Sequence, residues 1–208
     1  MNRFIVNIRG TNGAGKTKLA EAFMGDRREG GALGGEDVTL LTYMKQLKSE
    51  QRSKPILGRW NAMDRTMLVG KYGHANCGGC DTIPTQDLIC DAVRAATEYK
   101  DCRVVVFEGS LVSTIFDRYK QLDMELNKKG WKYLWCYMSP SAEECIERVL
   151  KRTEGAKTTT IADKHRAVRA TRDKAMKSGL RVLDMSTGWD AANGIPDAFY
   201  TLAGECQL

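Results

Sequence analysis

Residues 10–17 read Gly10-Thr11-Asn12-Gly13-Ala14-Gly15-Lys16-Thr17 and match the pattern G-x-x-x-x-G-K-[ST] at every fixed position. A short apolar run at residues 4–8 precedes this motif, and a helix-like segment at residues 18–24 follows it. A phosphate-binding loop needs this context, because glycines let backbone N–H groups turn inward and the next helix presents its N-terminus to the anion. We therefore predict that residues 10–17 bind the phosphates of a nucleotide.

Two side chains at the end of this loop have specific expected roles. Lys16 is expected to reach the β- and γ-phosphates, so that it also acts in catalysis, and the Thr17 hydroxyl is expected to bind Mg²⁺. The sequence between strand and helix thus predicts the donor side of a phosphoryl-transfer site.

Composition sets the broad class of the protein. The chain has 208 residues, of which 42% are hydrophobic and 28% are charged, as in a single globular α/β domain. Its 32 basic residues exceed its 26 acidic residues and give a net charge of +6. This surplus suits a polyanionic partner, although nucleotide binding accounts for part of it. With seven scattered cysteines, no apolar run near the ~20 residues of a membrane span and no visible signal peptide, we expect a cytoplasmic protein with reduced thiols.

Strand and helix patterns alternate along the chain. Strands are expected at residues 3–9, 38–43, 54–60, 66–72, 104–107, 131–138 and 180–184. Helices are expected at residues 16–24, 84–99, 113–129, 141–151, 161–177 and 191–203, and a mobile loop at 25–35. This alternation predicts a doubly wound parallel sheet, the P-loop NTPase fold, with helices on both faces. We expect one domain over residues 1–208, with a substrate-side insert near 54–83, whose two strands pair, and a lid region near 148–172.

Glu108 follows the most apolar run of the chain, Val104 to Phe107. Such a run is typical of a central strand buried on both faces, and ligands bind at the carboxyl ends of such strands. Glu108 is therefore predicted to hold Mg²⁺ or to take a proton from an attacking hydroxyl. The alternative is an acid that ends the strand and faces water.

Arg148 and Arg152 are four residues apart and share one face of a predicted helix. Phosphoryl transfer needs positive charge near the developing γ-phosphate, which a closing lid often supplies. We predict that at least one of the two arginines is catalytic. A solvated basic helix face is the alternative.

The segment Lys71-Tyr72-Gly73-His74-Ala75-Asn76-Cys77-Gly78-Gly79-Cys80-Asp81 admits several interpretations. His74, Cys77 and Cys80 could bind zinc, with Cys90 as a distant fourth ligand, but the chain has no second Cys-x-x-Cys. We favour a substrate loop in which Gly78 and Gly79 allow close backbone approach and Asp81 supplies a carboxylate. An irregular loop packed on the sheet is the third possibility.

Aromatic and basic residues surround this segment. Trp60 and Tyr72 are predicted to stack on bases, and Arg59 and Lys71 to contact phosphates, as in an electrostatic groove with aromatic platforms.

The motifs together resemble the P-loop kinases of the nucleoside and nucleotide kinase group. As in those kinases, the phosphate loop comes first, then the Glu108-Gly109 strand end, then the Arg148–Arg152 region. A switch GTPase is not indicated, because the stretch Asn127-Lys128-Lys129-Gly130 lacks the Asp of the N-K-x-D motif. The segment at residues 72–83 resembles that of the phage 5-hydroxymethyluracil DNA kinases. That resemblance implies ATP, Mg²⁺ and DNA carrying a hydroxymethylated pyrimidine. We expect Asp81 or Glu108 to activate the acceptor hydroxyl.

Two other functions remain open at this point. One is a kinase of a free nucleoside or nucleoside monophosphate, and the other is an ATPase module that couples hydrolysis to partner binding. If a phage encodes this protein, we expect it to act in the cytoplasm of the host cell.

Overall fold

The computed structural model describes residues 2–25, 34–47, 50–74, 77–185, 188–190 and 195–206. The strands are β1 (Arg3–Arg9), β2 (Glu36–Leu47), β3 (Glu50–Asn61), β4 (Thr66–Val69), β5 (Lys71–His74), β6 (Cys77–Gly79), β7 (Val104–Glu108), β8 (Trp131–Met138), β9 (Val182–Met185), β10 (Trp189–Asp190) and β11 (Ile195–Pro196). The helices are α1 (Lys16–Ala22), η1 (Cys80–Thr82), α2 (Gln86–Glu98), α3 (Ser110–Thr114), α4 (Asp117–Lys128), α5 (Ala142–Arg152), α6 (Ile161–Lys177) and α7 (Asp197–Cys206).

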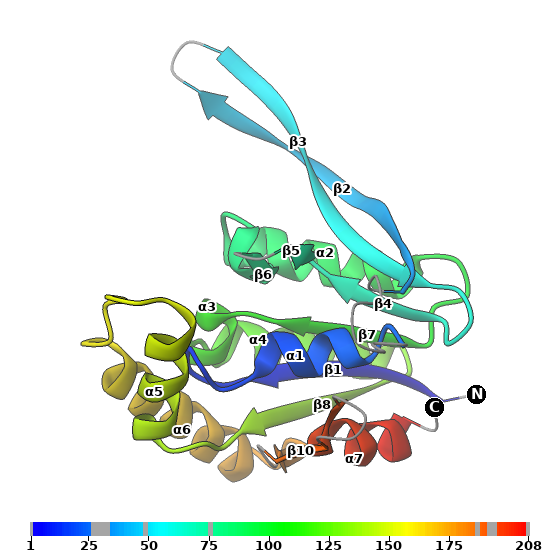
Figure 1. Ribbon diagram of the computed structural model, residues 1–208. Coiled ribbons are helices and arrows are strands. Elements are labelled where there is room, and N and C mark those ends of the chain that lie inside the picture. The colour runs from blue at the N-terminus through cyan, green and yellow to red at the C-terminus, as the bar shows by residue number, and fades with distance from the viewer. Residues whose placement is uncertain are drawn as a thin grey trace.

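A seven-stranded sheet with the order β2-β3-β4-β7-β1-β8-β9 forms the centre of the fold (Figure 1). The strands from β4 to β9 in this order run parallel, whereas β2 and β3 run antiparallel to their neighbours. The chain leaves β1 to build one side of the sheet and later returns to build the other. This reversal creates a crevice at the carboxyl ends of the central strands, where ligands bind in such folds. The predicted α/β class with a P-loop NTPase-like sheet is confirmed.

Two apolar cores cover the two faces of the sheet, because successive strand residues point to opposite sides. On β1, Phe4, Val6 and Ile8 join the core beneath α1 and α7, whereas Ile5 joins the core beneath α2, α4 and α6. Within the described residues, no helix combines the length and the apolar character needed to cross a membrane.

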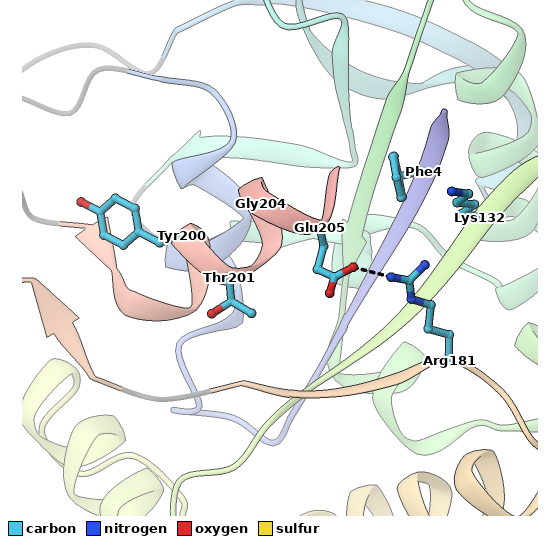
Figure 2. Close-up of a pocket in the computed structure, with 7 residues that line it drawn as sticks. All are labelled: Phe4, Lys132, Arg181, Tyr200, Thr201, Gly204 and Glu205. Carbon is cyan, nitrogen blue, oxygen red and sulfur yellow. Dashed lines mark hydrogen bonds and ion pairs between the residues drawn. The ribbon is translucent and has the colours of Figure 1, made fainter. Parts of the chain in front are cut away.

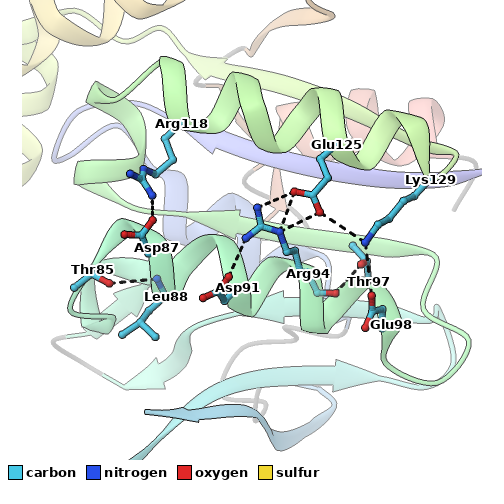
Figure 3. Close-up of polar contacts among 10 residues, drawn as sticks. All are labelled: Thr85, Asp87, Leu88, Asp91, Arg94, Thr97, Glu98, Arg118, Glu125 and Lys129. Atoms are coloured by element: carbon cyan, nitrogen blue, oxygen red, sulfur yellow. Dashed lines mark hydrogen bonds and ion pairs between the residues drawn. The ribbon is translucent and has the colours of Figure 1, made fainter. Parts of the chain in front are cut away.

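Ion pairs join α2 to α4 outside the core (Figure 3). Arg94 on α2 donates to Glu125 on α4 at 2.7 Å and to Asp91 at 2.9 Å. The Thr85 hydroxyl caps α2 by accepting from the Leu88 amide at 3.2 Å. The helix therefore begins after Thr85 and not at residue 84 as predicted, because the side-chain cap replaces the missing backbone acceptor.

Polar side chains interrupt the central strand β1. Asn7 is buried and donates to the Tyr133 hydroxyl at 3.0 Å. The buried Arg9 guanidinium lies over the rings of Tyr119, Trp135 and Tyr137 and donates to the Ile115 carbonyl. Burial lowers the pKa of Arg9, and aromatic rings supply a favourable face for the cation.

The N-terminal side of the sheet differs from the prediction. The segment 54–83, expected as a small insert, contributes β3 and β4 to the main sheet, and these two strands pair as predicted. The strand expected at residues 38–43 is half of β2, which forms a long two-stranded ribbon with β3 that extends away from the body (Figure 1). The helix expected at residues 113–129 is divided into α3 and α4. Most of the predicted loop at residues 25–35 lies outside the described residues.

Candidate active site

The phosphate loop connects β1 to α1 in the predicted place. Gly13 has a φ of +85°, and a Cβ atom there would lie 2.4 Å from the Cys145 carbonyl oxygen. A side chain at this position is therefore excluded both by backbone conformation and by space. The carbonyl belongs to α5, so the loop and the beginning of α5 are packed against one another.

Lys16 and Thr17 begin α1 at the carboxyl edge of the sheet. Lys16 is buried, and its Nζ donates to the Thr11 carbonyl at 3.1 Å. The Thr17 hydroxyl donates to Glu108 Oε1 at 3.0 Å. A hydroxyl and a carboxylate oxygen thus lie side by side next to the loop. These are the oxygen ligands that Mg²⁺ prefers, so the residues present fit the expected ion.

Glu108 is almost completely buried at the end of β7, with 2% of its surface exposed. Burial raises its pKa, and the neighbouring carboxylates of Asp81 and Glu21 act in the same direction. Lys16 and the Thr17 hydrogen bond oppose this rise. A buried carboxylate among other acids is expected to gain most from a bound cation. The alternative of a strand-end acid that faces water is therefore wrong.

Gly78 and Gly79 lie directly against this pair of oxygen ligands. A Cβ atom at Gly78 would be 2.7 Å from Thr17 Oγ1, and one at Gly79 would be 2.5 Å from Glu108 Oε1. Gly79 also has a φ of +52°. The backbone of β6 therefore approaches Thr17 and Glu108 more closely than any side chain would permit, while the role of these glycines in a substrate loop stays a prediction.

Asp81 lies one turn further on, in η1, where it is exposed. Its Oδ1 accepts a hydrogen bond from the Ser110 amide at 2.8 Å. Within the described part of the chain, its Oδ2 has no protein partner. One carboxylate oxygen is thus held in position, and the other faces solvent beside the Glu108 site.

Arg148 and Arg152 lie on the exposed side of α5. The helix begins at the phosphate loop, and its Ser141–Glu144 capping box forms as the sequence indicates. Arg148 Nη2 lies 3.9 Å from Glu144 Oε1. Among the described residues, Arg152 has no hydrogen-bond or ion-pair partner. Neither arginine contacts the phosphate loop in this conformation, so a catalytic role stays a prediction.

Trp60 and Arg59, which were predicted to contact the substrate, do not lie at the candidate active site. Trp60 is 2% exposed and packs edge-on against Tyr99, so its ring has no free face for a base. Arg59 donates to the Gly34 and Gly35 carbonyls at the base of the ribbon. Through β4, Trp60 is level with Val105 and Arg59 with Val106 of β7, so both lie before the Glu108 end of that strand. The structure therefore argues against direct substrate contact by Trp60 and Arg59.

Tyr72 and Lys71 flank the site on β5. Lys71 is exposed, which leaves phosphate contact possible. Tyr72 is 2% exposed, and burial next to Glu108 raises its pKa well above the ordinary value. A covered ring cannot stack on a base, so Tyr72 is instead a core residue, packed in the cluster that includes Leu19 and Ala20 of α1.

The structure does not test the alternative interpretation of this segment as a zinc site. The side chains of His74 and Cys77 lie outside the described residues. Cys80 is buried, its Sγ lies 3.5 Å from the Val69 carbonyl, and burial raises the pKa of its thiol.

Sequence reasoning missed several residues that organise the site. Ser110 donates from its hydroxyl to Asn12 in the phosphate loop at 2.6 Å, while its amide holds Asp81. Ser113 accepts from the Gly10 amide at 3.0 Å. Both serines lie in the short helix α3, which begins directly after Glu108-Gly109. The start of a helix at the carboxyl end of this strand was the sequence feature that could have identified them.

A surface hollow lies elsewhere, between α7 and the starts of β1 and β8 (Figure 2). Phe4, Lys132 and the Arg181–Glu205 ion pair line it. Phe4 pairs with Lys132 at the amino edge of the sheet, opposite the phosphate loop. The hollow is therefore separate from the candidate active site.

Replacement of Glu108 by Gln is expected to stabilise the protein without ligands at neutral pH. The raised pKa means that folding favours the protonated carboxyl, so this stabilisation is complete below the ordinary carboxylate range, about pH 4, and is lost as pH rises through the folded pKa. Gln avoids the buried charge at every pH. Thermal denaturation should show a higher melting temperature at pH 8, by roughly 2–4 °C for each kcal/mol, and no gain near pH 4. The exposed Glu154→Gln is the control, and a Glu108 variant that melts lower at pH 8 contradicts the assignment.

Comparison with known proteins gives a consistent result. No family model matches the chain. A protein of Pseudomonas phage M6 named 5-hmdU DNA kinase is 28% identical over 193 residues, which is 90% of this chain and 92% of that protein. Proteins of the same name from Pseudomonas phage PaMx11 and Delftia phage PhiW-14 are 29% and 26% identical over 71% and 85% of this chain, and over 68% and 65% of their own lengths. Over most of its length, the chain is similar to phage kinases that are named for 5-hmdU in DNA.

Proposed function

We propose that this protein transfers the γ-phosphate of ATP to the hydroxymethyl group of 5-hydroxymethyluracil in DNA. One observation carries the proposal: the Gly78-Gly79 backbone lies against the Thr17–Glu108 pair, with Asp81 beside them. The segment proposed to bind the acceptor thus lies against the segment proposed to bind ATP, at one point of the sheet edge. The similar phage kinases, named for 5-hmdU DNA, support the choice of acceptor.

The phosphate loop and Lys16 would hold the β- and γ-phosphates of ATP. Thr17 and Glu108 would hold Mg²⁺, which when bound neutralises charge on these phosphates. The 3.0 Å hydrogen bond between Thr17 and Glu108 supports this assignment, because it holds the two oxygens close enough to be ligands of one ion.

Asp81 is proposed as the base. The acceptor hydroxyl oxygen forms a bond to the γ-phosphorus, the bond from that phosphorus to the β-phosphate oxygen breaks, and ADP leaves. Asp81 takes the hydroxyl proton, for which its solvent-facing Oδ2 is suited by position. Glu108 is less suited, because its Oε1 is engaged by Thr17.

Arg148 and Arg152 are proposed to stabilise the transferring phosphoryl group once α5 and the following segment close over ATP. The contact between Gly13 and the Cys145 carbonyl supports this proposal, since it places the start of α5 next to the phosphates. A phage enzyme of this kind would act in the host cytoplasm.

The test is to incubate the protein and ATP labelled at the γ-phosphate with three acceptors. These are DNA that contains 5-hydroxymethyluracil, the same DNA with thymine, and the free nucleoside. Label in the first DNA alone is expected. Label in the free nucleoside without DNA would instead favour a nucleoside kinase, and ATP hydrolysis with no labelled acceptor would favour an ATPase module.

A further inference from the structure

The ribbon formed by β2 and β3 is the largest feature of the fold that the proposed chemistry does not use. Each strand has twelve residues, or about 40 Å at the usual rise, whereas most strands have five or six. The packing described for the ribbon lies toward its base, where Ile56 joins the core beneath α2 and the partly buried Leu41 and Tyr43 pack against it. The outer half contributes little to the stability of the fold, because a two-stranded hairpin stabilises itself poorly in water. Its length therefore indicates a role in binding.

The register of the sheet shows where the ribbon extends. The Gly70 amide donates to the Leu57 carbonyl at 2.9 Å, and Leu68 of β4 pairs with Val106 of β7. Leu57 is therefore level with Glu108 across the sheet. Residues 50–56 continue beyond this level, by about 23 Å, on the carboxyl side. Figure 1 shows the tip reaching toward the side where α3 and α5 lie, the side of the candidate active site.

The charge of this outer part is strongly positive. Residues 42–55 contain four basic residues and one acid, which is half of the net charge of +6 carried by the whole chain. Lys45 pairs with Arg52 and Tyr43 pairs with Lys54 across the ribbon. Because cross-strand partners and alternate residues share a face, Lys45, Arg52 and Lys54 lie on one face together with Tyr43. All three basic side chains are exposed.

We propose that the outer ribbon, residues 42–47 and 50–55, binds duplex DNA and holds it at the carboxyl edge of the sheet. This inference rests on the proposed function, since it supplies the binding surface for that DNA. The charge is complementary to the phosphate backbone, and a two-stranded ribbon has the width that the DNA major groove admits, about 12 Å. Lys45, Arg52 and Lys54 are the phosphate contacts.

Self-association through the free edge of β2 is the competing use of such a ribbon. Lysines on edge strands also prevent pairing with other chains. Two copies would bring two positive tips together, which opposes a stable dimer, whereas DNA neutralises them. The charge of the segment therefore favours DNA as the occupant.

The experiment compares two triple variants of the full chain. Lys45→Ala, Arg52→Ala and Lys54→Ala remove the ribbon charges. Lys128→Ala, Lys174→Ala and Lys177→Ala remove three exposed charges at the ends of α4 and α6, at the amino edge of the sheet. Affinity for a short duplex with 5-hydroxymethyluracil is measured by fluorescence anisotropy at several salt concentrations, and thermal denaturation verifies folding.

The ribbon variant should bind DNA about 10- to 100-fold more weakly at physiological salt, and the slope of log affinity against log salt should fall by about 3. The control variant should bind like the parent protein. A charge-keeping variant (Lys45→Arg, Arg52→Lys, Lys54→Arg) should restore binding. Equal DNA affinity of the two alanine variants overturns the proposal, as does a ribbon variant that changes self-association alone.

Two measurements, DNA affinity and phosphate transfer to DNA, test the ribbon proposal and the proposed function separately. If the parent protein labels DNA but the ribbon variant binds as tightly as the control, the ribbon proposal is wrong and the kinase function stands. If the ribbon charges govern DNA binding but no DNA takes label, the ribbon proposal stands and the acceptor assignment is wrong.

Discussion

Lys16→Ala is expected to abolish phosphate transfer while the protein remains folded. Lys16 is buried within the phosphate loop, where its Nζ donates to the Thr11 carbonyl. Loss of one preorganised charge at a transferring group costs about 10²–10³ in rate, and a lysine that also lowers the pKa of Glu108 should lie at the upper end. Initial rates with γ-labelled ATP, at saturating acceptor, measure the effect.

Lys18 provides a matched control for this experiment. It lies two residues further along α1 and is exposed. Lys18→Ala removes the same charge from the same helix and should leave the rate unchanged. Retention of activity in Lys16→Ala, or an equal loss in Lys18→Ala, would show that the loop does not bind the γ-phosphate.

The donor side could be predicted because its determinants are local. Gly13, Lys16 and Thr17 lie within one loop, and a loop between a strand and a helix has few possible conformations. The position of Glu108 could be predicted equally well, since four consecutive apolar residues define a buried strand and its carboxyl end. The contact between Thr17 and Glu108 then follows from the pairing of β1 with β7, which only the fold provides.

The acceptor side was less predictable, because the same residue pattern suits two environments. An aromatic residue next to a basic one fits a stacking platform, but it also fits a core position at a sheet edge. Trp60 and Tyr72 are both core residues: Trp60 lies on β3 beside β4 in the main sheet, and Tyr72 lies on β5 of the separate β5–β6 pair and packs in the core that includes α1. The pairing of β3 with β4 was predicted, but the sequence does not show that β4 pairs in turn with β7, which makes these strands part of the main sheet.

The ribbon was also missed for a physical reason. Strand prediction depends on alternating apolar residues over one buried face. Of the described side chains beyond Leu41 and Ile56, those at residues 42, 44, 45 and 52–55 are exposed, so they show no alternation of buried and exposed positions. Asn7 and Arg9 differ in the opposite direction, since they are polar residues that are buried. Aromatic partners on β8 and α4 make their burial possible.

Asp81→Asn is expected to lower phosphate transfer by about 10²–10⁴-fold while ATP and Mg²⁺ bind normally. The Asn side-chain oxygen can still accept from the Ser110 amide, so the loop keeps its position, but an amide cannot take the proton of the acceptor hydroxyl. Single-turnover rates and ATP affinity, measured on the same preparation, separate the two effects. Asp117→Asn is the control, since Asp117 is an exposed carboxylate in the first turn of α4.

Glu108→Gln in the same assay distinguishes the two carboxylates. If Glu108 holds Mg²⁺ with Thr17, its variant should lose metal-dependent ATP affinity as well as rate, because one of two protein oxygens at the ion is replaced by a weaker ligand. The Asp81 variant should lose rate alone. The opposite pattern, in which Glu108→Gln binds ATP and Mg²⁺ normally but transfers nothing while Asp81→Asn stays active, would make Glu108 the base. The burial of Glu108 beneath Gly79 argues against that pattern, since a base must reach the hydroxyl of its acceptor.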